Sequence, residues 1–320
     1  MSSKNQFIKR KSFVPFSMYD AFTEVPYSGS QAAVVLSAAD INISKRTQIA
    51  RELGLPATAF VDNIHGNRVK AQFFSTVMEL QMCGHGTVCL VTHLVAQKLL
   101  SCEGKGWHNV TLVLPQGGAG VEYRQTAAGR VEVMLDVQPP SFCKPNFKLD
   151  ELMGILGIGF SEISRDLVPE IASGDFVHLC LPMCDLAAMQ DLTPDFDALA
   201  KFCISNGLET VATFCNAAVD KSCDLHVRDF CPAVGVAESA AAGTTNAALS
   251  AYFFRHGLIK SDTDGTIQLR AEQGIELGRP SQVTTRIEKK NGSIKRLQVG
   301  GLASCILEGT LNLGLQEKRQ

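Results

Sequence analysis

Four residues in the stretch MELQMCGHGTVCLVTHLVAQKLL (78–100) have side chains or backbones suited to chemistry: Cys83, Gly84, His85 and Gly86. They come where a helix over about 86–99 is predicted to begin, and an apolar helix needs none of them. A helix start leaves about four N–H groups unpaired and carries roughly half a positive charge. A thiol there should have a lowered pKa, and an imidazole can give or take a proton. The stretch therefore predicts a proton-transfer site on a helix end.

A second stretch, AGTTNAALSAYFFRHGLI (242–259), repeats this arrangement with Gly243 and Thr244 before another apolar helix. A helix that is apolar nearly all round must be surrounded, and in a chain of many short strands a curled sheet is the element that can do so. We expect an α+β fold of two similar halves, each a barrel-like sheet around one helix. If both helix starts face one groove, they would attract carboxylates, enolates or other developing anions.

Short strand-like runs occur on both sides of the sequence QPPSF, at 138–142, and turn-forming Gly, Pro, Asn and Asp residues separate them. We predict an N-terminal half over 14–137 with a C-terminal strand at about 304–314, a C-terminal half over 138–303, and disorder in 1–13. A further helix is predicted over 42–54, with Ser44 as its cap and Gly54 as its stop.

Composition excludes several classes of protein. The chain has 320 residues, 45% of them hydrophobic, and a formal net charge of −2, which gives no electrostatic basis for binding nucleic acid or an anionic membrane. No apolar run approaches the roughly 20 residues of a membrane span. Eleven scattered cysteines indicate reduced core thiols in a cytoplasmic protein and no structural zinc. GGAG (117–120) lies between two strands, so it predicts a hairpin turn and no nucleotide cofactor.

Five stretches of the sequence resemble motifs of the phenazine-biosynthesis isomerase (PhzF-like) family. They are DAFTEVPYSGSQAAVV (20–35), IARELGLPATAFV (49–61), FFSTVMELQMCGHGT (73–87), GVAESAAAGTTNAALSAYFFRHG (235–257) and QGIELGRPS (273–281). The matches run in order over nearly the whole chain. The resemblance implies the diaminopimelate-epimerase-like fold, which proline racemase shares, with the active site between two pseudo-symmetric halves. It also implies cofactor-free chemistry and makes a homodimer plausible.

The sequence departs from the family at the residues that carry its chemistry. Ala57 stands where the family has its general acid/base glutamate, and Ser239 and Thr244 stand where it has an aspartate and a serine. The second cysteine of the related racemases falls on Ala242. Neither parent mechanism therefore carries over unchanged.

The first hypothesis is a cofactor-free isomerase that moves a proton on an intermediate of specialised metabolism, by alkene or keto isomerisation, epimerisation or epoxide rearrangement. Its catalytic candidates are Cys83, His85, Thr244 and Ser239, and its binding candidates are Gly84, Gly86, Thr87, Gly243, Thr245, Ala57, Asp20, Glu79 and Glu238, the last three also as fallback acids. One correctly placed acid can contribute about 10²–10⁴-fold to the rate. The partner is a small molecule, and no metal is expected.

Two alternatives remain open. The first is a racemase or dehydratase of proline or hydroxyproline, with Cys83 as the base and Thr244 in the second half. The second is an inactive homologue that binds a ligand without turning it over. A protein that had lost its catalytic activity could also have lost the family's carboxylates, as this sequence has.

Overall fold

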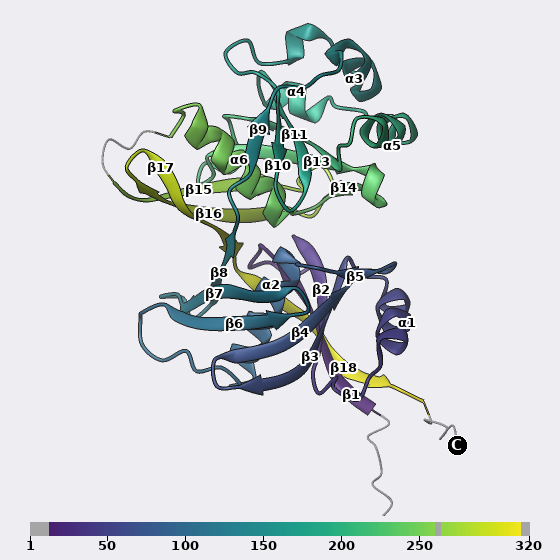
Figure 1. Cartoon of the computed structure of the whole chain (residues 1–320), viewed down its shortest axis with the longest axis vertical. Helices are drawn as coiled ribbons and strands as arrows, with labels where there is room; N and C mark the ends of the chain where they lie inside the picture. Colours follow the sequence, from purple (N-terminus) through teal and green to yellow (C-terminus); the bar gives the residue numbers. More distant parts are fainter. Residues whose placement is uncertain (1–12, 260–263, 315–320) are drawn as a thin grey trace, which may run out of the picture.

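A computed structural model describes residues 13–259 and 264–314 as two halves joined along one long sheet (Figure 1). The predicted disorder falls on residues 1–13, of which only Phe13 is described. None of the helices within the described ranges is long and apolar enough to span a bilayer.

The N-terminal half is a curled sheet closed by the end of the chain. Its strands are β1 (Phe13–Ala21), β2 (Ser30–Val35), β3 (Ala57–His65), β4 (Arg68–Phe74), β5 (Glu79–Leu80), β6 (His108–Leu114), β7 (Gly117–Gln125), β8 (Val131–Val137) and β18 (Ala303–Asn312). β1 pairs with both β2 and β18, so the last described strand completes the sheet that the first one starts. A short helix, α1 (Ile43–Leu53), packs outside on Phe60 and Phe74.

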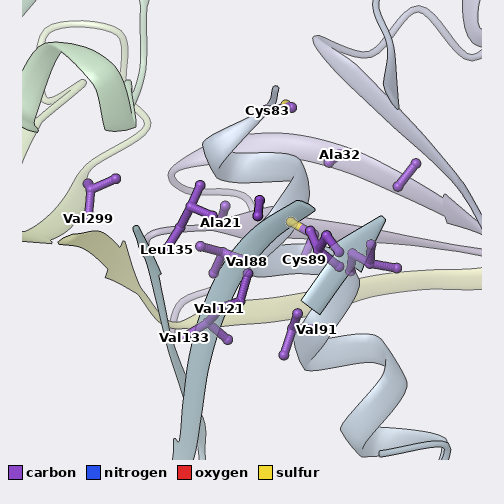
Figure 2. Close-up of a cluster of buried hydrophobic side chains, with 14 of the residues drawn as sticks. Ala21, Ala32, Cys83, Val88, Cys89, Val91, Val121, Val133, Leu135 and Val299 are labelled. Carbon is purple, nitrogen blue, oxygen red and sulfur yellow. The ribbon is translucent and has the colours of Figure 1, made fainter. Parts of the chain in front are cut away.

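Helix α2 (Gly84–Ala96) lies inside this sheet, as its apolar sequence predicts. Every residue from Gly86 to Leu94 is buried, and the helix contacts β1, β2, β3, β8, β17 and β18. Figure 2 shows Val88, Cys89 and Val91 pointing into a core that the surrounding strands complete. This enclosure fixes where the helix begins, and with it Cys83 and His85.

The C-terminal half repeats the plan around α6 (Gly243–Arg255). Its strands are β9 (Ser141–Cys143), β10 (Glu170–Ser173), β11 (Val177–Pro182), β12 (Thr210–Cys215), β13 (Leu225–Cys231), β14 (Val236–Ser239), β15 (Gly265–Gln273), β16 (Ser281–Lys290) and β17 (Ser293–Gly301). Its outer elements are α3 (Leu149–Leu156), α4 (Leu186–Gln190), α5 (Phe196–Ser205) and short 3₁₀ turns at Phe160–Glu162 and Pro232–Val234. They build a second apolar cluster on the outer face of β11–β13 (Figure 1).

Strand β17 belongs to both halves. It pairs along its length with β16, and its last five residues pair with β8. At Gly300 a Cβ would lie 1.8 Å from the carbonyl oxygen of Val133, so this close approach needs glycine. The predicted fold of two pseudo-symmetric halves, each a curled sheet around a central helix, is confirmed; the predicted boundaries at 137/138 and 303/304 stay a prediction.

Local details differ from the sequence-based expectations. The N-cap of α1 is Asn42, whose side chain accepts a hydrogen bond from the Lys45 N–H at 2.9 Å, so the prediction of Ser44 is wrong. The stop at Gly54, in the left-handed conformation, is confirmed. The hairpin between β6 and β7 is present, but its turn lies at 115–116; Gly117 to Gly120 pair with β6 as the first residues of β7, so the prediction that they form the turn is wrong. All eleven cysteines lie in the described ranges, and all are free thiols.

Candidate active site

The N-terminal tips of α2 and α6 touch. Cys83 caps α2 and Ala242 caps α6, both in extended backbone conformations. A Cβ added to Gly84 would lie 3.7 Å from the Gly243 Cα, and one added to Gly243 would lie 3.8 Å from the Gly84 Cα. The unpaired first-turn N–H groups of two helices therefore converge where residues 83–86 meet residues 242–245, which we call the tip junction.

On the α2 side, Cys83 and His85 lie close together. The Cys83 Sγ is 3.6 Å from both ring nitrogens of His85. Cys83 is only 5% exposed, and burial raises the pKa of its thiol to about 12, although the Gly86 N–H lowers it slightly. The expectation that the helix start lowers this pKa is wrong, because desolvation of a thiolate outweighs the effect of the helix end.

His85 is half-buried, and burial lowers its pKa to about 4. At neutral pH the ring is therefore uncharged, with one nitrogen able to accept a proton, while the neighbouring Cys83 thiol keeps its own. The pair can take a proton from a substrate more readily than it can act as a thiolate nucleophile.

On the α6 side, the tip has a carboxylate behind it that the sequence analysis did not identify. Asp229 on β13 is 2% exposed, and its Oδ2 accepts a hydrogen bond from the Thr245 hydroxyl at 2.9 Å. Its Oδ1 is buried without a partner in the described part of the chain. Burial raises the pKa of Asp229 to about 6. In the β13–β14 register Asp229 lies directly opposite Ser239.

A second buried group near this tip is His178 on β11. Its Nδ1 lies 2.7 Å from the Thr210 hydroxyl, and burial lowers its pKa to about 4. His178 and Thr244 line the same small cavity of about 20 Å³, which is room for about one water molecule. Sequence spacing gives no signal for Asp229 or His178, because both reach α6 only through strand register.

Three carboxylates among the predicted residues are already engaged. Asp20 is fully buried and accepts hydrogen bonds from Arg279 at 2.8 Å and from the Tyr27 N–H at 2.6 Å. Burial still raises the pKa of Asp20, while its donors act in the opposite direction. Glu79 accepts a hydrogen bond from the Gln72 side chain at 2.8 Å.

Glu238 makes a bidentate pair with Arg228, with both N–O distances 2.9 Å. Glu238 neighbours Ser239 in β14, and since successive strand residues point to opposite faces, its carboxylate turns away from Asp229. It lines a hollow of about 610 Å³ with Arg228, Phe196 and Leu277.

The remaining predicted residues are spread around the tips. Ala57 is buried at the start of β3, where it pairs with Ala32 of β2. Thr87 is fully buried in α2, and its hydroxyl has no partner in the described ranges. In residues 13–259 and 264–314 no group of three or more His, Cys, Asp or Glu is arranged to hold a metal ion.

Comparison with known proteins agrees with this geometry. A sequence model of the family described as phenazine biosynthesis-like protein matches residues 19–309. A trans-2,3-dihydro-3-hydroxyanthranilate isomerase from Pseudomonas chlororaphis is 27% identical over 299 residues, which cover 93% of this chain and 99% of the relative.

Two solved structures share the fold. A PhzF-family phenazine biosynthesis protein from Bacillus anthracis superposes with a TM-score of 0.84 at 23% identity, covering 93% of this chain and 99% of its own. A hydroxyproline epimerase from Agrobacterium vitis with bound trans-4-hydroxy-L-proline gives a TM-score of 0.60 at 11% identity, covering 95% and 93%. With nearly the whole chain matched by the family's sequence model and a relative that is an isomerase, this protein belongs to the phenazine biosynthesis-like protein family and is an isomerase.

Proposed function

We propose that this isomerase moves a proton within a small, unsaturated organic acid, an intermediate of specialised metabolism, without a cofactor. His85 takes a proton from one carbon, the first-turn N–H groups of both helices hold the resulting enolate-type anion, and the proton returns at another position. Cys83 orients the His85 ring from 3.6 Å. The eleven free thiols support a cytoplasmic enzyme, and the family resemblance supports a homodimer.

The observation that carries this proposal is the contact between the two helix starts at Gly84 and Gly243, with an uncharged imidazole beside it. N–H donors arranged in advance for a developing anion commonly contribute most of an enzyme's electrostatic catalysis. The uncharged ring has a nitrogen free to accept a proton at neutral pH, and because its pKa is low, the imidazolium that forms gives the proton up readily.

The first substrate to test is trans-2,3-dihydro-3-hydroxyanthranilate, because a relative acts on it; unsaturated analogues that differ in ring hydroxyls complete the panel. Turnover in D₂O is followed by NMR, and solvent deuterium should appear at the carbon that gains the proton. In His85→Ala the rate should fall about 10²–10⁴-fold.

Cys83→Ser serves as the matched variant for the same rate assay. It should retain much of the activity, since Cys83 orients the ring and does not exchange the proton. A folded His85→Ala enzyme with full activity would contradict the proposal, as would wild-type protein that turns over no member of the panel.

A racemase of proline-like amino acids is the second candidate, and the retained Cys83 at the α2 cap favours it. The α6 cap, however, is Ala242, so the opposite tip offers no second thiol. This candidate predicts solvent deuterium at the α-carbon of proline or 4-hydroxyproline.

A further inference from the structure

We propose that Asp229 is the second proton-exchanging group of this site and that the Ser239 hydroxyl connects it to the substrate. The inference rests on the proposed function and deepens it, because it gives the α6 tip a proton-exchanging group opposite His85. Since Asp229 acts through Ser239, it is a positioning residue, whereas Ser239 touches the substrate.

One oxygen of the Asp229 carboxylate is buried without a regular hydrogen bond in the described ranges. A buried carboxylate oxygen without a donor costs free energy, and native proteins rarely retain one without a reason. Thr245 satisfies Oδ2 at 2.9 Å, while Oδ1 is buried and makes no hydrogen bond of ordinary geometry in the described ranges. The Thr210 hydroxyl lies near enough to lower the pKa of the carboxyl, but it does not complete the hydrogen bonding of Oδ1. The carboxylate is therefore fixed by Thr245 through one oxygen, and its other oxygen can accept a further donor.

Ser239 lies on the neighbouring strand, directly beside Asp229. Directly paired residues of antiparallel strands point to the same face with Cβ atoms about 4.5–5.5 Å apart, and Asp229 pairs directly with Ser239. Ser239 is half-buried, whereas Asp229 is sealed. The Gln273 side chain donates to the Ser239 carbonyl at 2.8 Å and fixes this strand end three residues before Ala242. The proposal requires the Ser239 hydroxyl to turn toward Oδ1, which the direct pairing of the two residues places within reach.

The proton balance is simple. The substrate passes a proton to the Ser239 Oγ as the hydroxyl proton of Ser239 passes to the Asp229 Oδ1, so the substrate becomes an anion and Asp229 becomes neutral. The anion then takes a proton at another position from protonated His85. In the opposite direction His85 takes the proton and the relay returns one, and exchange with water restores both groups after each turnover. No oxidant, reductant or further reactant is needed.

The surroundings of Asp229 suit this exchange. Burial is the main cause of its raised pKa of about 6, the charge of Glu238 on β14 adds to it, and the hydroxyls of Thr245 and Thr210 act against it. The other titratable groups near Asp229 are Cys180 on β11 and Cys231 on β13, whose thiol pKa values are raised chiefly by burial and further by the charge of Asp229. His178 contacts Thr210, whose hydroxyl also lowers the pKa of Asp229, and His178 is uncharged at neutral pH. A group that titrates near the working pH can both take and release a proton.

The kinetic test compares Asp229→Asn and Ser239→Ala with the control Asp197→Asn, an exposed aspartate on α5. In the wild type, kcat/KM should rise with pH through about 6, because Asp229 must be ionised to accept the proton. In both test variants the rise of kcat/KM with pH should disappear. Their kcat should fall about 10²-fold, and KM should change little. The double variant should be no slower than either single variant, because the two act in one relay. Asp197→Asn should match the wild type.

A second measurement needs no substrate: the titration of ¹³C-labelled aspartate carboxyls by NMR. One resonance, absent from Asp229→Asn, should titrate near pH 6, and its midpoint should rise in Ser239→Ala because a donor to the carboxylate is lost. An inactive wild type with this Ser239-dependent titration would overturn the proposed function and support the contact. The inference would be overturned if the enzyme were active and Asp229→Asn left its kcat unchanged. It would also be overturned if Ser239→Ala left the titration midpoint unchanged. Either result would leave the proposed function standing.

Discussion

Burial sets the protonation of the residues around the tip junction. The same desolvation that keeps the proton on Cys83 removes it from His85 and raises the pKa of Asp229. An uncharged imidazole and a weakly acidic carboxyl thus flank the place where two helix starts offer N–H donors. At neutral pH the site therefore has a base on each side, His85 at the start of α2 and Asp229 behind the start of α6. The only positive charge at the tip junction is the partial charge of the two helix starts.

The raised pKa of Asp229 predicts that this residue costs stability. A carboxyl with a pKa of 3.8 when unfolded and about 6 when folded binds its proton more tightly in the folded state. Stability is therefore lost as pH rises from about 4 to 6. Asn mimics the protonated form, so Asp229→Asn should match the wild type below pH 4 and exceed it by about 3 kcal/mol at pH 7.

Urea unfolding of both proteins between pH 3.5 and 8 measures this difference. A wild type that is the more stable protein at pH 7 would show that the carboxylate has donors that neutralise its burial. Lower activity with higher stability is the expected signature of a functional buried charge.

Residue-scale prediction from sequence succeeded for local patterns and failed for register. The pair of helix starts could be identified because glycine and small residues precede each apolar run. Asp229 could not be identified, because it becomes part of the site only when β13 pairs with β14 and faces the first turn of α6. The pKa of Cys83 was predicted with the wrong sign because its burial depends on the strands around α2.

At the scale of the element, the first turn of α2 is shaped by close packing. A Cβ on Gly86 would lie 2.9 Å from the Cys83 Sγ and 2.9 Å from the Phe73 ring, whereas one on Gly84 would meet only the Gly243 Cα at 3.7 Å. Both glycines lie in the helix, and both avoid the left-handed region. Gly86 is therefore required for space and Gly84 is not.

Alanine at each glycine separates these effects. Gly86→Ala should lower stability by about 1–3 kcal/mol, as overpacking does, and should move Cys83 and so reduce activity. Gly84→Ala should leave stability within about 1 kcal/mol of the wild type or raise it slightly, because alanine favours the helix. Thermal unfolding and the isomerase assay measure both; equal effects of the two substitutions would show that backbone flexibility matters here instead of packing.

At the scale of the whole molecule, an ion pair ties the loop after β15 to the end of β1. Arg279 donates to Asp20, to the Ser28 carbonyl and to the Gly29 carbonyl, at 2.8–2.9 Å. Asp20 in turn holds the Tyr27 N–H, with Tyr27 in the left-handed region at φ 68°. One buried carboxylate thus fixes a loop of the N-terminal half against the C-terminal half.

Removing the guanidinium leaves Asp20 buried and without its countercharge. Arg279→Ala should lower the free energy of unfolding by about 3 kcal/mol, as loss of one partner of a buried pair does. Lys295→Ala, which breaks the exposed pair with Glu288, should cost less than about 1 kcal/mol. Chemical denaturation of both variants provides the comparison, and similar small losses would show that Asp20 is neutral in the folded protein.

The shared strand β17 has a mechanical consequence. Because its backbone pairs with β16 on one side and with β8 on the other, the halves cannot separate along this edge without breaking the β17–β8 pairing. Strand β17 contacts both α2 and α6, and its Val299 side chain lies 3.4 Å from where a Cβ on Gly243 would be. Weakening the β17–β8 pairing would therefore displace the starts of both helices relative to each other.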